Sequence, residues 1–314
     1  MANLLKRHEF WLGMFIIALC LLLGWRSEEF FTFGNLYDLA NNYAMLTILA
    51  CGLFVVLIAG GIDISFPAMT IIAQYGMVVM LQKVGGNFAV AFVLAGGGAA
   101  MIIGLCNGIL IAGIRVSPIL ATLGMMTLLK GINILITGGS AIANYPQWVL
   151  WLNHAQWFGI PLPMWLFAVV AAGLWVLLEK SPLGRAIMLI GSNERATHYS
   201  GINTRRVLMW VYVISALLCA VAAFLMMSKL NSAKASYGES YLLVSILAAV
   251  LGGVNPDGGS GRIVGMVLAL FLLQIIESGF NILGISPYLT MALWGVLLLC
   301  FIQARGMLGL ERAG

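Results

Sequence analysis

The stretch EKSPLGRAIMLIGSNERATHYSGINTRR (residues 179–206) is a polar segment with an apolar segment of membrane-spanning length on each side. It carries more positive than negative side chains, namely Lys180, Arg185, Arg195, Arg205 and Arg206 against Glu179 and Glu194. Lys and Arg collect on the cytoplasmic side of membrane proteins. We therefore interpret residues 179–206 as the largest cytoplasmic loop of a membrane protein, and as a place where a soluble partner can act on it.

The composition of the whole chain supports this interpretation. The 314 residues are 62% hydrophobic and only 9% charged, and the mean hydropathy is +1.02. Soluble globular domains carry about 25% charged residues, so most of this surface is expected to face lipid. The apolar runs are continuous and do not alternate with polar residues, which predicts helices and not the strands of a membrane barrel. The expected fold class is an all-α membrane protein.

Apolar runs of about 20 residues predict about ten transmembrane helices in a single domain that covers residues 1–314. The expected helices cover residues 10–24, 43–60, 66–82, 88–112, 118–137, 163–178, 207–228, 241–254, 263–281 and 287–304. With both termini in the cytoplasm, the external segments hold only Arg26, Lys83, Lys229 and Lys234, and the cytoplasmic segments hold eleven Lys and Arg residues. This bias favours that orientation. The helices at 66–82 and 241–254 are short.

Several classes of function have no support in the sequence. The net charge of +5 lies at helix ends, where membrane orientation explains it, so no nucleic-acid partner is expected. The five cysteines are scattered singly and the three histidines are far apart, so no metal site is expected. The stretch NPDGGSGR (255–262) lacks the lysine and hydroxyl residue of a phosphate-binding loop, and is expected to be a tight turn. No catalytic constellation is present, so the chain is not expected to be an enzyme or to bind a cofactor.

Polar residues inside the apolar segments are the candidates for a solute path. Gln274, Glu277, Ser278 and Asn281 share one face of the expected helix 263–281, and Lys130 in the helix 118–137 would lower the cost of burying Glu277 if the two paired. The full candidate set is Asp63, Ser65, Asn107, Asn133, Gln274, Glu277 and Asn281. Two interpretations remain open, a path for a polar solute and a buried structural network. For Asp63, in the stretch GGIDIS (60–65), capping of a new helix is favoured over solute binding.

The expected helix 88–112 carries small residues at intervals of four. They are Gly96, Ala100, Gly104, Gly108 and Ala112. A stripe of this kind lets two membrane helices approach closely, so we expect this helix to pack tightly against another one.

Four stretches in a fixed order resemble a known family. They are GGIDIS (60–65), SPILATLGMMTLLKG (117–131), SPLGRAIMLIGSNERATHYSGI (181–202) and ILAAVLGGVNPDGGSGRIVG (246–265). Together they resemble the permeases of ATP-binding-cassette (ABC) importers of the ribose, galactose, xylose and autoinducer-2 class. The resemblance implies a ten-helix permease, related in fold to the cobalamin importers, in the bacterial inner membrane. It also implies a second permease subunit, cytoplasmic ATPase subunits that bind ATP and Mg²⁺, and a periplasmic solute-binding protein.

The resemblance also places the contact with the ATPase. The family segment G-x-N-x-x-A-A-x-x-S-G-I matches residues 191–202, with Thr197 where the second alanine is usual. The residues expected to couple to the ATPase are Gly191, Ser192, Asn193, Glu194, Arg195, Ala196, Thr197, Ser200 and Gly201. A short helix at about 193–200 is expected, and Gly201 is suited to end it. The sequence departs from the family again at Phe66-Pro67, where Val-Gly is common.

Two functions follow as expectations. The first is the permease subunit of an importer of a small neutral polar solute such as a monosaccharide, working by alternating access driven by the partner ATPase. Scattered amides and hydroxyls suit such a solute. The alternative is an ion-coupled secondary transporter in which Glu277, Lys130 or Asp63 titrates.

Overall fold

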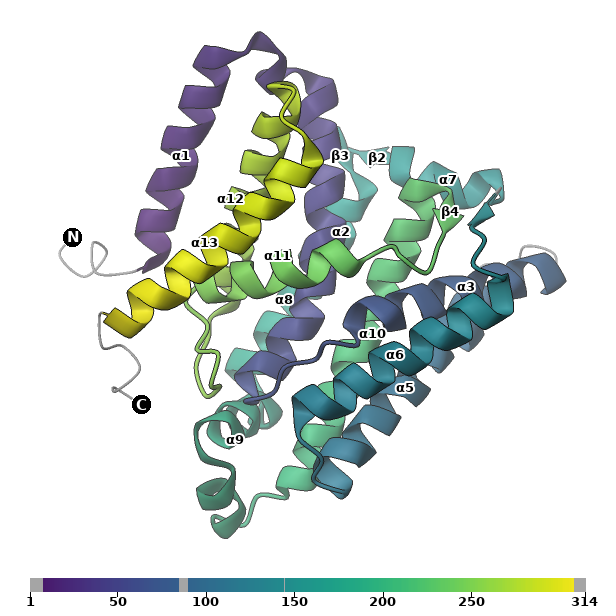
Figure 1. Cartoon of the computed structure of the whole chain (residues 1–314), viewed down its shortest axis with the longest axis vertical. Coiled ribbons are helices and arrows are strands. Elements are labelled where there is room, and N and C mark those ends of the chain that lie inside the picture. The colour runs from purple at the N-terminus through teal and green to yellow at the C-terminus, as the bar shows by residue number, and fades with distance from the viewer. Residues whose placement is uncertain (1–7, 85–89, 144, 308–314) are drawn as a thin grey trace.

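The computed structural model describes residues 8–84, 90–143 and 145–307, and most of these residues are helical (Figure 1). The first half of the chain contains α1 (His8–Arg26), η1 (Glu28–Phe31), α2 (Phe33–Ile58), α3 (Phe66–Val84), η2 (Ala91–Gly97), α5 (Gly98–Gly108), η3 (Ile109–Gly113), α6 (Pro118–Thr137) and α7 (Gln147–His154). The second half contains α8 (Leu162–Trp175), η4 (Val176–Lys180), α9 (Pro182–Tyr199), α10 (Thr204–Leu230), α11 (Glu239–Leu251), α12 (Ile263–Ile282) and α13 (Pro287–Met307).

Short strands form two small antiparallel ladders. β1 (Ile142–Ala143) pairs with β4 (Ser232–Ala233), and β2 (Gln156–Trp157) pairs with β3 (Ile160–Pro161). The segment between the expected helices 118–137 and 163–178 therefore contains a helix, α7, and a hairpin. The strands are too short to change the fold class, so the prediction of an all-α membrane protein is confirmed.

Each apolar segment expected from the sequence is largely helical where the structure describes it; residues 88–89, at the start of the expected helix 88–112, lie outside the described residues. Within the described residues, seven helices are long and apolar enough to cross a membrane, and α3, α11 and α13 contribute shorter apolar stretches (66–81, 241–251 and 287–300). The helix predicted at 118–137 has the bounds of α6. The second one begins at Phe33 and not at residue 43. The ten residues before position 43 are polar enough to lie outside an apolar run, but Thr32 caps the helix, and the side chains of Tyr37 and Asn41 donate to the carbonyl of Asn153.

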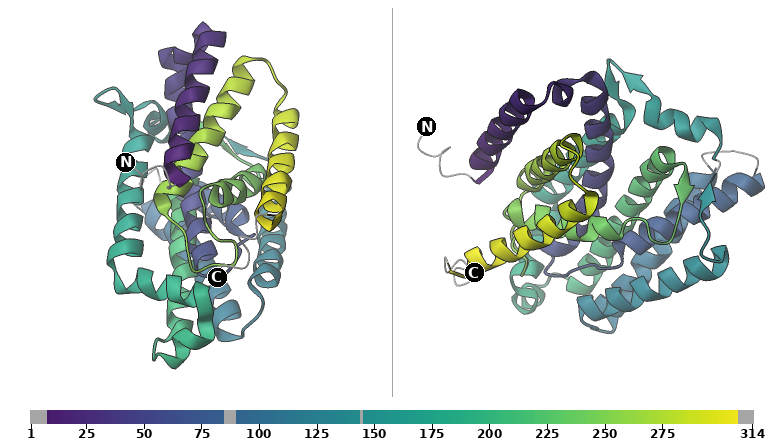
Figure 2. Two further views of the ribbon diagram at one scale, coloured as in Figure 1. Left: turned by 90° about the vertical axis from the view of Figure 1, so that its left-hand side faces the viewer. Right: turned by 45° about the horizontal axis from the view of Figure 1, so that its top comes forward.

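The helices α2 and α10 form the centre of the molecule (Figure 1). Both are extensively buried, and α3, α5, α8, α11 and α12 pack against one or both of them. The helices α1, α6 and α8 lie on the outside and expose much of their apolar surface, as expected for helices that face lipid. Figure 2 shows that α9 lies at one end of the molecule, across the ends of the long helices.

Gly104 and Gly108 of the small-residue stripe pack against α10, whereas Gly96 faces Met77 of α3. A Cβ atom placed on Gly104 would lie 2.7 Å from the carbonyl oxygen of Tyr212 and 2.8 Å from Cβ of Ala216, and one on Gly108 would lie 3.1 Å from Cα of Met209. These distances leave no room for a larger side chain. The expected tight helix pair is confirmed, and the structure identifies α10 as the partner.

Candidate functional site

The polar stretch 179–206 forms two helical pieces within α9. The backbone is non-helical at Asn193, with φ −161° and ψ 100°, and a second short helix follows this kink. The side-chain oxygen of Asn193 accepts a hydrogen bond from the amide of Ala196 at 2.9 Å, which makes Asn193 the N-cap of that helix. Gly201 ends it with a φ of +86°. The predicted short helix at 193–200 and its glycine stop are confirmed.

We name this second piece (residues 194–199) the coupling helix, after the role that the resemblance predicts for it, and most of its surface is exposed to solvent. Glu194, Arg195, Ala196 and Ser200 are exposed, and Thr197 is buried. The Thr197 hydroxyl donates to the carbonyl of Asn193 at 2.8 Å, so it is satisfied within the helix where the family usually has alanine.

Tyr199 is a candidate contact residue that the sequence pattern does not single out. Its side chain is 89% exposed at the end of the coupling helix. The family segment has no fixed residue type at this position, so the resemblance gave no signal. The sequence does contain one indication of a contact residue here, which is an aromatic side chain in an otherwise polar loop. A Tyr exposed to this degree offers a large amphipathic surface to a partner.

Three candidate path residues form one buried network at the break between α2 and α3. Asp63, Ser65 and Asn107 are each 0% exposed. The Ser65 hydroxyl donates to Oδ1 of Asp63 at 2.6 Å, and Nδ2 of Asn107 donates to the Ser65 hydroxyl at 3.0 Å. The Ser65 amide also donates to Oδ1 of Asp63 at 2.8 Å, immediately before α3 begins. Asp63 therefore caps a new helix, as favoured from the sequence.

The same break is fastened to α6 by Thr122. Its hydroxyl accepts a hydrogen bond from the amide of Ile64 at 3.1 Å and lies 3.2 Å from the carbonyl oxygen of Ile62. Thr122 was not among the sequence candidates, because a lone Thr in an apolar helix has many uses. The second carboxylate oxygen of Asp63 and the amide oxygen of Asn107 have no hydrogen-bond partner among the described atoms. The network therefore holds spare acceptors at the junction of α3, α5 and α6.

The other path candidates lie elsewhere. Asn133 on α6 is buried, and neither of its amide atoms has a partner among the described residues. On α12, Gln274 is buried, but Glu277 and Asn281 are exposed. The polar face expected on this helix therefore does not point into the bundle as a unit.

The pairing of Lys130 with Glu277 is not formed. The charged neighbour of Glu277 is Lys229, which also faces Asp38. The helices α6 and α12, which carry Lys130 and Glu277, lie on opposite sides of α2 and α10 (Figure 1). Lys130 was the expected partner because it lies within an expected helix, whereas Lys229 lies in the last turn of α10.

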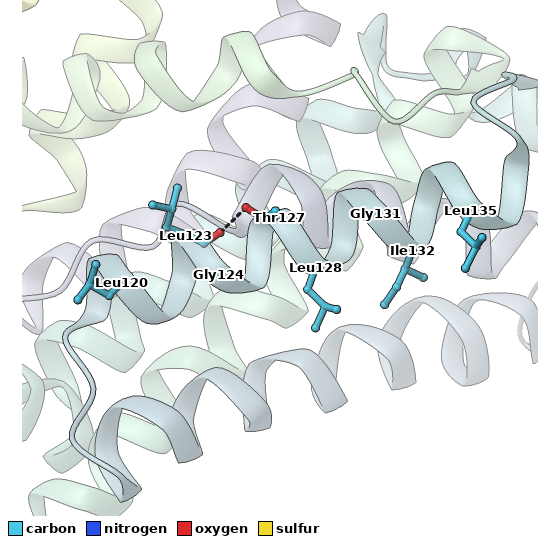
Figure 3. Close-up of a pocket in the computed structure, with 8 residues that line it drawn as sticks. All are labelled: Leu120, Leu123, Gly124, Thr127, Leu128, Gly131, Ile132 and Leu135. Atoms are coloured by element: carbon cyan, nitrogen blue, oxygen red, sulfur yellow. Dashed lines mark hydrogen bonds between the residues drawn. The ribbon is translucent and has the colours of Figure 1, made fainter.

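One face of α6 borders an open groove of about 680 Å³ (Figure 3). All its lining residues come from α6: Leu120, Leu123, Gly124, Thr127, Leu128, Gly131, Ile132 and Leu135. Gly124 and Gly131 have no atom within 4 Å of where a Cβ would stand. The Thr127 hydroxyl is satisfied by the carbonyl of Leu123 at 3.0 Å. The face is therefore apolar and, at Leu120, Leu128 and Leu135, largely exposed.

Residues 35–302 match the family model described as "Branched-chain amino acid transport system / permease component". The chain belongs to this family. The ribose import permease protein of Escherichia coli strain K12 is 34% identical to this permease over 90% of the chain and 89% of the relative. The ribose import permease protein of Bacillus subtilis strain 168 is also 34% identical, over 92% and 89%. The autoinducer 2 import system permease protein of Photorhabdus temperata is 31% identical, over 95% and 91%.

These relatives confirm the resemblance to importer permeases of the ribose and autoinducer-2 class. No solved structure matches the chain. Among the residues that the structure describes, no three His, Cys, Asp or Glu side chains gather as a metal site would require.

Proposed function

We propose that this permease is the membrane subunit of an ABC importer that moves a small neutral polar solute of the monosaccharide type into the bacterial cell. The observation that carries the proposal is the exposed, separately capped coupling helix in a chain of this family. The names of the relatives, which import ribose and autoinducer 2, support the solute class. The chain would sit in the inner membrane with about ten crossings, in a fold related to the cobalamin importers.

The coupling helix is the proposed docking element for a cytoplasmic ATPase subunit. It stands at one end of the molecule, exposed along most of its length, with Tyr199 at its tip. Aromatic residues of this kind often dominate the energy of a protein interface. The ATPase supplies the energy by binding ATP and Mg²⁺, and the coupling helix of this chain is the element that it moves.

The start of α1 lies on the same side of the membrane as the coupling helix in this proposal. Arg262 in the turn after α11 forms a 3.2 Å ion pair with Glu9 in the first turn of α1. The neighbouring Gly259 packs against Ser192 in α9. Both features support a cytoplasmic N-terminus. The hairpin β2–β3 and α7 would then lie on the periplasmic side, where a solute-binding protein docks.

The second permease subunit, identical or similar to this one, is proposed to dock on the grooved face of α6. Leu120, Leu128 and Leu135 are exposed along this face by 66%, 56% and 83%. A two-fold pair would bring two such faces together, with the solute passing between the subunits as they alternate between outward-open and inward-open states.

The ion-coupled alternative is less well supported. It requires Asp63, Lys130 or Glu277 to take part in one titrating pathway. In the structure Asp63 is a helix cap at the α2–α3 break, Lys130 is on α6, and Glu277 lies on α12, on the other side of the core, with Lys229 as its charged neighbour.

The test is uptake by the reconstituted system. The permease would be placed in proteoliposomes with the ATPase subunits encoded beside it and the matching binding protein, and uptake of radiolabelled ribose, galactose or xylose measured. We expect uptake that requires ATP inside the proteoliposomes. This uptake should persist when an ionophore collapses the proton gradient. Uptake by the permease alone that disappears with the gradient would instead establish the ion-coupled alternative.

A further inference from the structure

Three glycines from distant parts of the chain meet where α9 contacts the rest of the protein. Gly60 follows the end of α2, Gly191 lies in α9 just before the kink, and Gly258 lies in the turn 255–262. We call this contact the glycine crossing. In Figure 1 the turn reaches down from the end of α11 toward α9.

The main chains touch at the crossing without any intervening side chain. A Cβ atom on Gly258 would lie 2.5 Å from Cα of Gly60 and 3.0 Å from Cα of Gly191. A Cβ atom on Gly191 would overlap the carbonyl oxygen of Ile58. Gly60 and Gly258 also have φ values of +84° and +94°, which glycine adopts freely and other residues rarely adopt. Glycine is therefore required at each position.

A hydrogen bond locks the turn onto the end of α2. At the end of α2 the amide of Gly60 donates to the carbonyl of Leu57, and the amide of Gly61 donates to the carbonyl of Val56, which is the pattern of a Schellman cap. The carbonyl of Ile58 takes no part in this cap, and it accepts a hydrogen bond from the amide of Gly259 at 2.9 Å. The turn thus supplies the partner that the helix end lacks.

Asn255 holds the shape of this turn. Its side-chain amide donates to the carbonyl of Gly258 at 3.1 Å. Its backbone amide donates to the carbonyl of Ser260, and its backbone carbonyl accepts from the amide of Gly258, at 3.0 Å each. The turn is consequently a rigid block seated between α2 and α9. Sequence reasoning predicted a tight turn here and assigned it no role.

The crossing leads directly to the buried network. Gly60 precedes Asp63 by three residues, and the residues on either side of Asp63, Ile62 and Ile64, are bonded to Thr122 on α6. Beyond it, Ser65 is bonded to Asn107 on α5 and starts α3. A displacement of α9 at Gly191 therefore reaches α3, α5 and α6 through main-chain contacts and short hydrogen bonds.

From this geometry we infer that Gly258 and Asn255 are positioning residues of transport, because the crossing that they build passes movement of the coupling helix to the α2–α3 break. This inference rests on the proposed function. Close-packed interiors have low compressibility and transmit strain, and a contact between bare main chains has no flexible side chain to absorb a displacement. The turn 255–262 thus takes part in coupling, although it lies outside the family's coupling segment.

The first test uses the unaltered complex. Hydrogen exchange would be measured on the permease with its ATPase subunits, with and without a non-hydrolysable ATP analogue. We expect the exchange of residues 58–65 and 255–262 to change together with that of residues 191–199. A change confined to 191–199 would overturn the inference and would leave the proposed function standing.

The second test separates coupling from folding. Gly258→Ala inserts a methyl group into the crossing and should lower uptake at least about 10-fold, while the complex still forms and hydrolyses ATP but no longer responds to the loaded binding protein. Asn255→Ala should act in the same direction without adding bulk, which keeps the test valid if Gly258→Ala does not fold. The matched control is Gly284→Ala, since Gly284 has a φ of +71° and open space around it.

The outcomes are distinct. Normal uptake and normal stimulation in both Gly258→Ala and Asn255→Ala would refute the role of the crossing. No ATP-dependent uptake by the unaltered complex would refute the proposed function itself.

Discussion

The side-chain amide of Asn107 donates a hydrogen bond to the hydroxyl of Ser65 at 3.0 Å, and this bond fastens α5 to the start of α3. Both residues are fully buried. Ser65 passes the bond on to Asp63, so three polar side chains that the sequence separates by 44 positions form one chain of hydrogen bonds. The break between α2 and α3 is therefore a fixed feature of the fold.

Ser65→Ala should destabilise the protein by about 1–3 kcal/mol, because it removes the hydroxyl that donates to Asp63 and leaves the buried side-chain amide of Asn107 without its acceptor. The measurement is thermal unfolding of the purified permease in detergent. Ser140→Ala is the control, since Ser140 is exposed in the turn that follows α6. Equal unfolding temperatures for the two variants would mean that the network contributes nothing to stability.

Asn193→Ala should weaken the coupling helix by about 1 kcal/mol through loss of its N-cap. The expected consequence is lower affinity for the ATPase subunit and less uptake, with no change in membrane insertion. Asn193→Ser should restore both, because serine is also a good cap. If Ala and Ser variants behave alike, the role of Asn193 does not depend on capping.

Tyr199→Ala should raise the Kd for the ATPase subunit about 30-fold, equivalent to about 2 kcal/mol, if Tyr199 is an interface anchor. Tyr199→Phe keeps the ring and should bind nearly normally. Tyr288→Ala removes another Tyr, 83% exposed at the start of α13 and far from the coupling helix, and serves as the control. Titration of the purified ATPase onto the permease in nanodiscs gives the three values. An unchanged Kd for Tyr199→Ala would place the interface elsewhere.

The charges of the coupling helix offer an independent probe. Exchanging them, with Glu194→Arg and Arg195→Glu in one chain, should uncouple ATP hydrolysis from uptake and leave insertion intact, because both side chains are exposed and support no internal contact in the described structure. The ratio of ATP hydrolysed to solute imported measures the effect. An unaltered ratio would remove these charges from the mechanism.

Gly104→Leu should reduce the yield of folded protein, because the added side chain meets the backbone of α10 at Tyr212. Overpacking of this kind typically costs about 1–3 kcal/mol. Gly13→Leu on α1 is matched in residue type and helical context, but has open space around it. Size-exclusion profiles of the two variants decide the question, and similar monodisperse yields would contradict the close α5–α10 packing.

Leu128→Cys should cross-link to a neighbouring permease subunit in native membranes if the α6 face is the subunit interface, since two-fold symmetry brings the same face of both copies together. Val169→Cys on α8, which is 69% exposed, should stay uncross-linked. A homodimer gives a symmetric product with Leu128→Cys alone. Cross-linking of Val169→Cys in place of Leu128→Cys would move the interface to α8.

Local features of the sequence determined where the helices lie and where some of them begin and end. Continuous apolar runs gave the positions of the helices, Ser117-Pro118 gave the start of α6, and Gly201 gave the end of the coupling helix. Each of these depends on residues a few positions apart, so the information is contained in the sequence itself. The family segment then predicted which residues couple to the ATPase, although it gave no residue type for the position of Tyr199.

Only the tertiary structure decided which of these elements meet. It brought Asn107 to Ser65, placed Gly258 against Gly60 and Gly191, and gave Glu277 the neighbour Lys229 and not Lys130. The physical reason is that lipid-facing and protein-facing surfaces of membrane helices are equally apolar, so residue type alone does not fix the rotation of a helix or its neighbour. A contact between glycines from three segments is the extreme case, because it leaves no side chain from which the partners can be inferred.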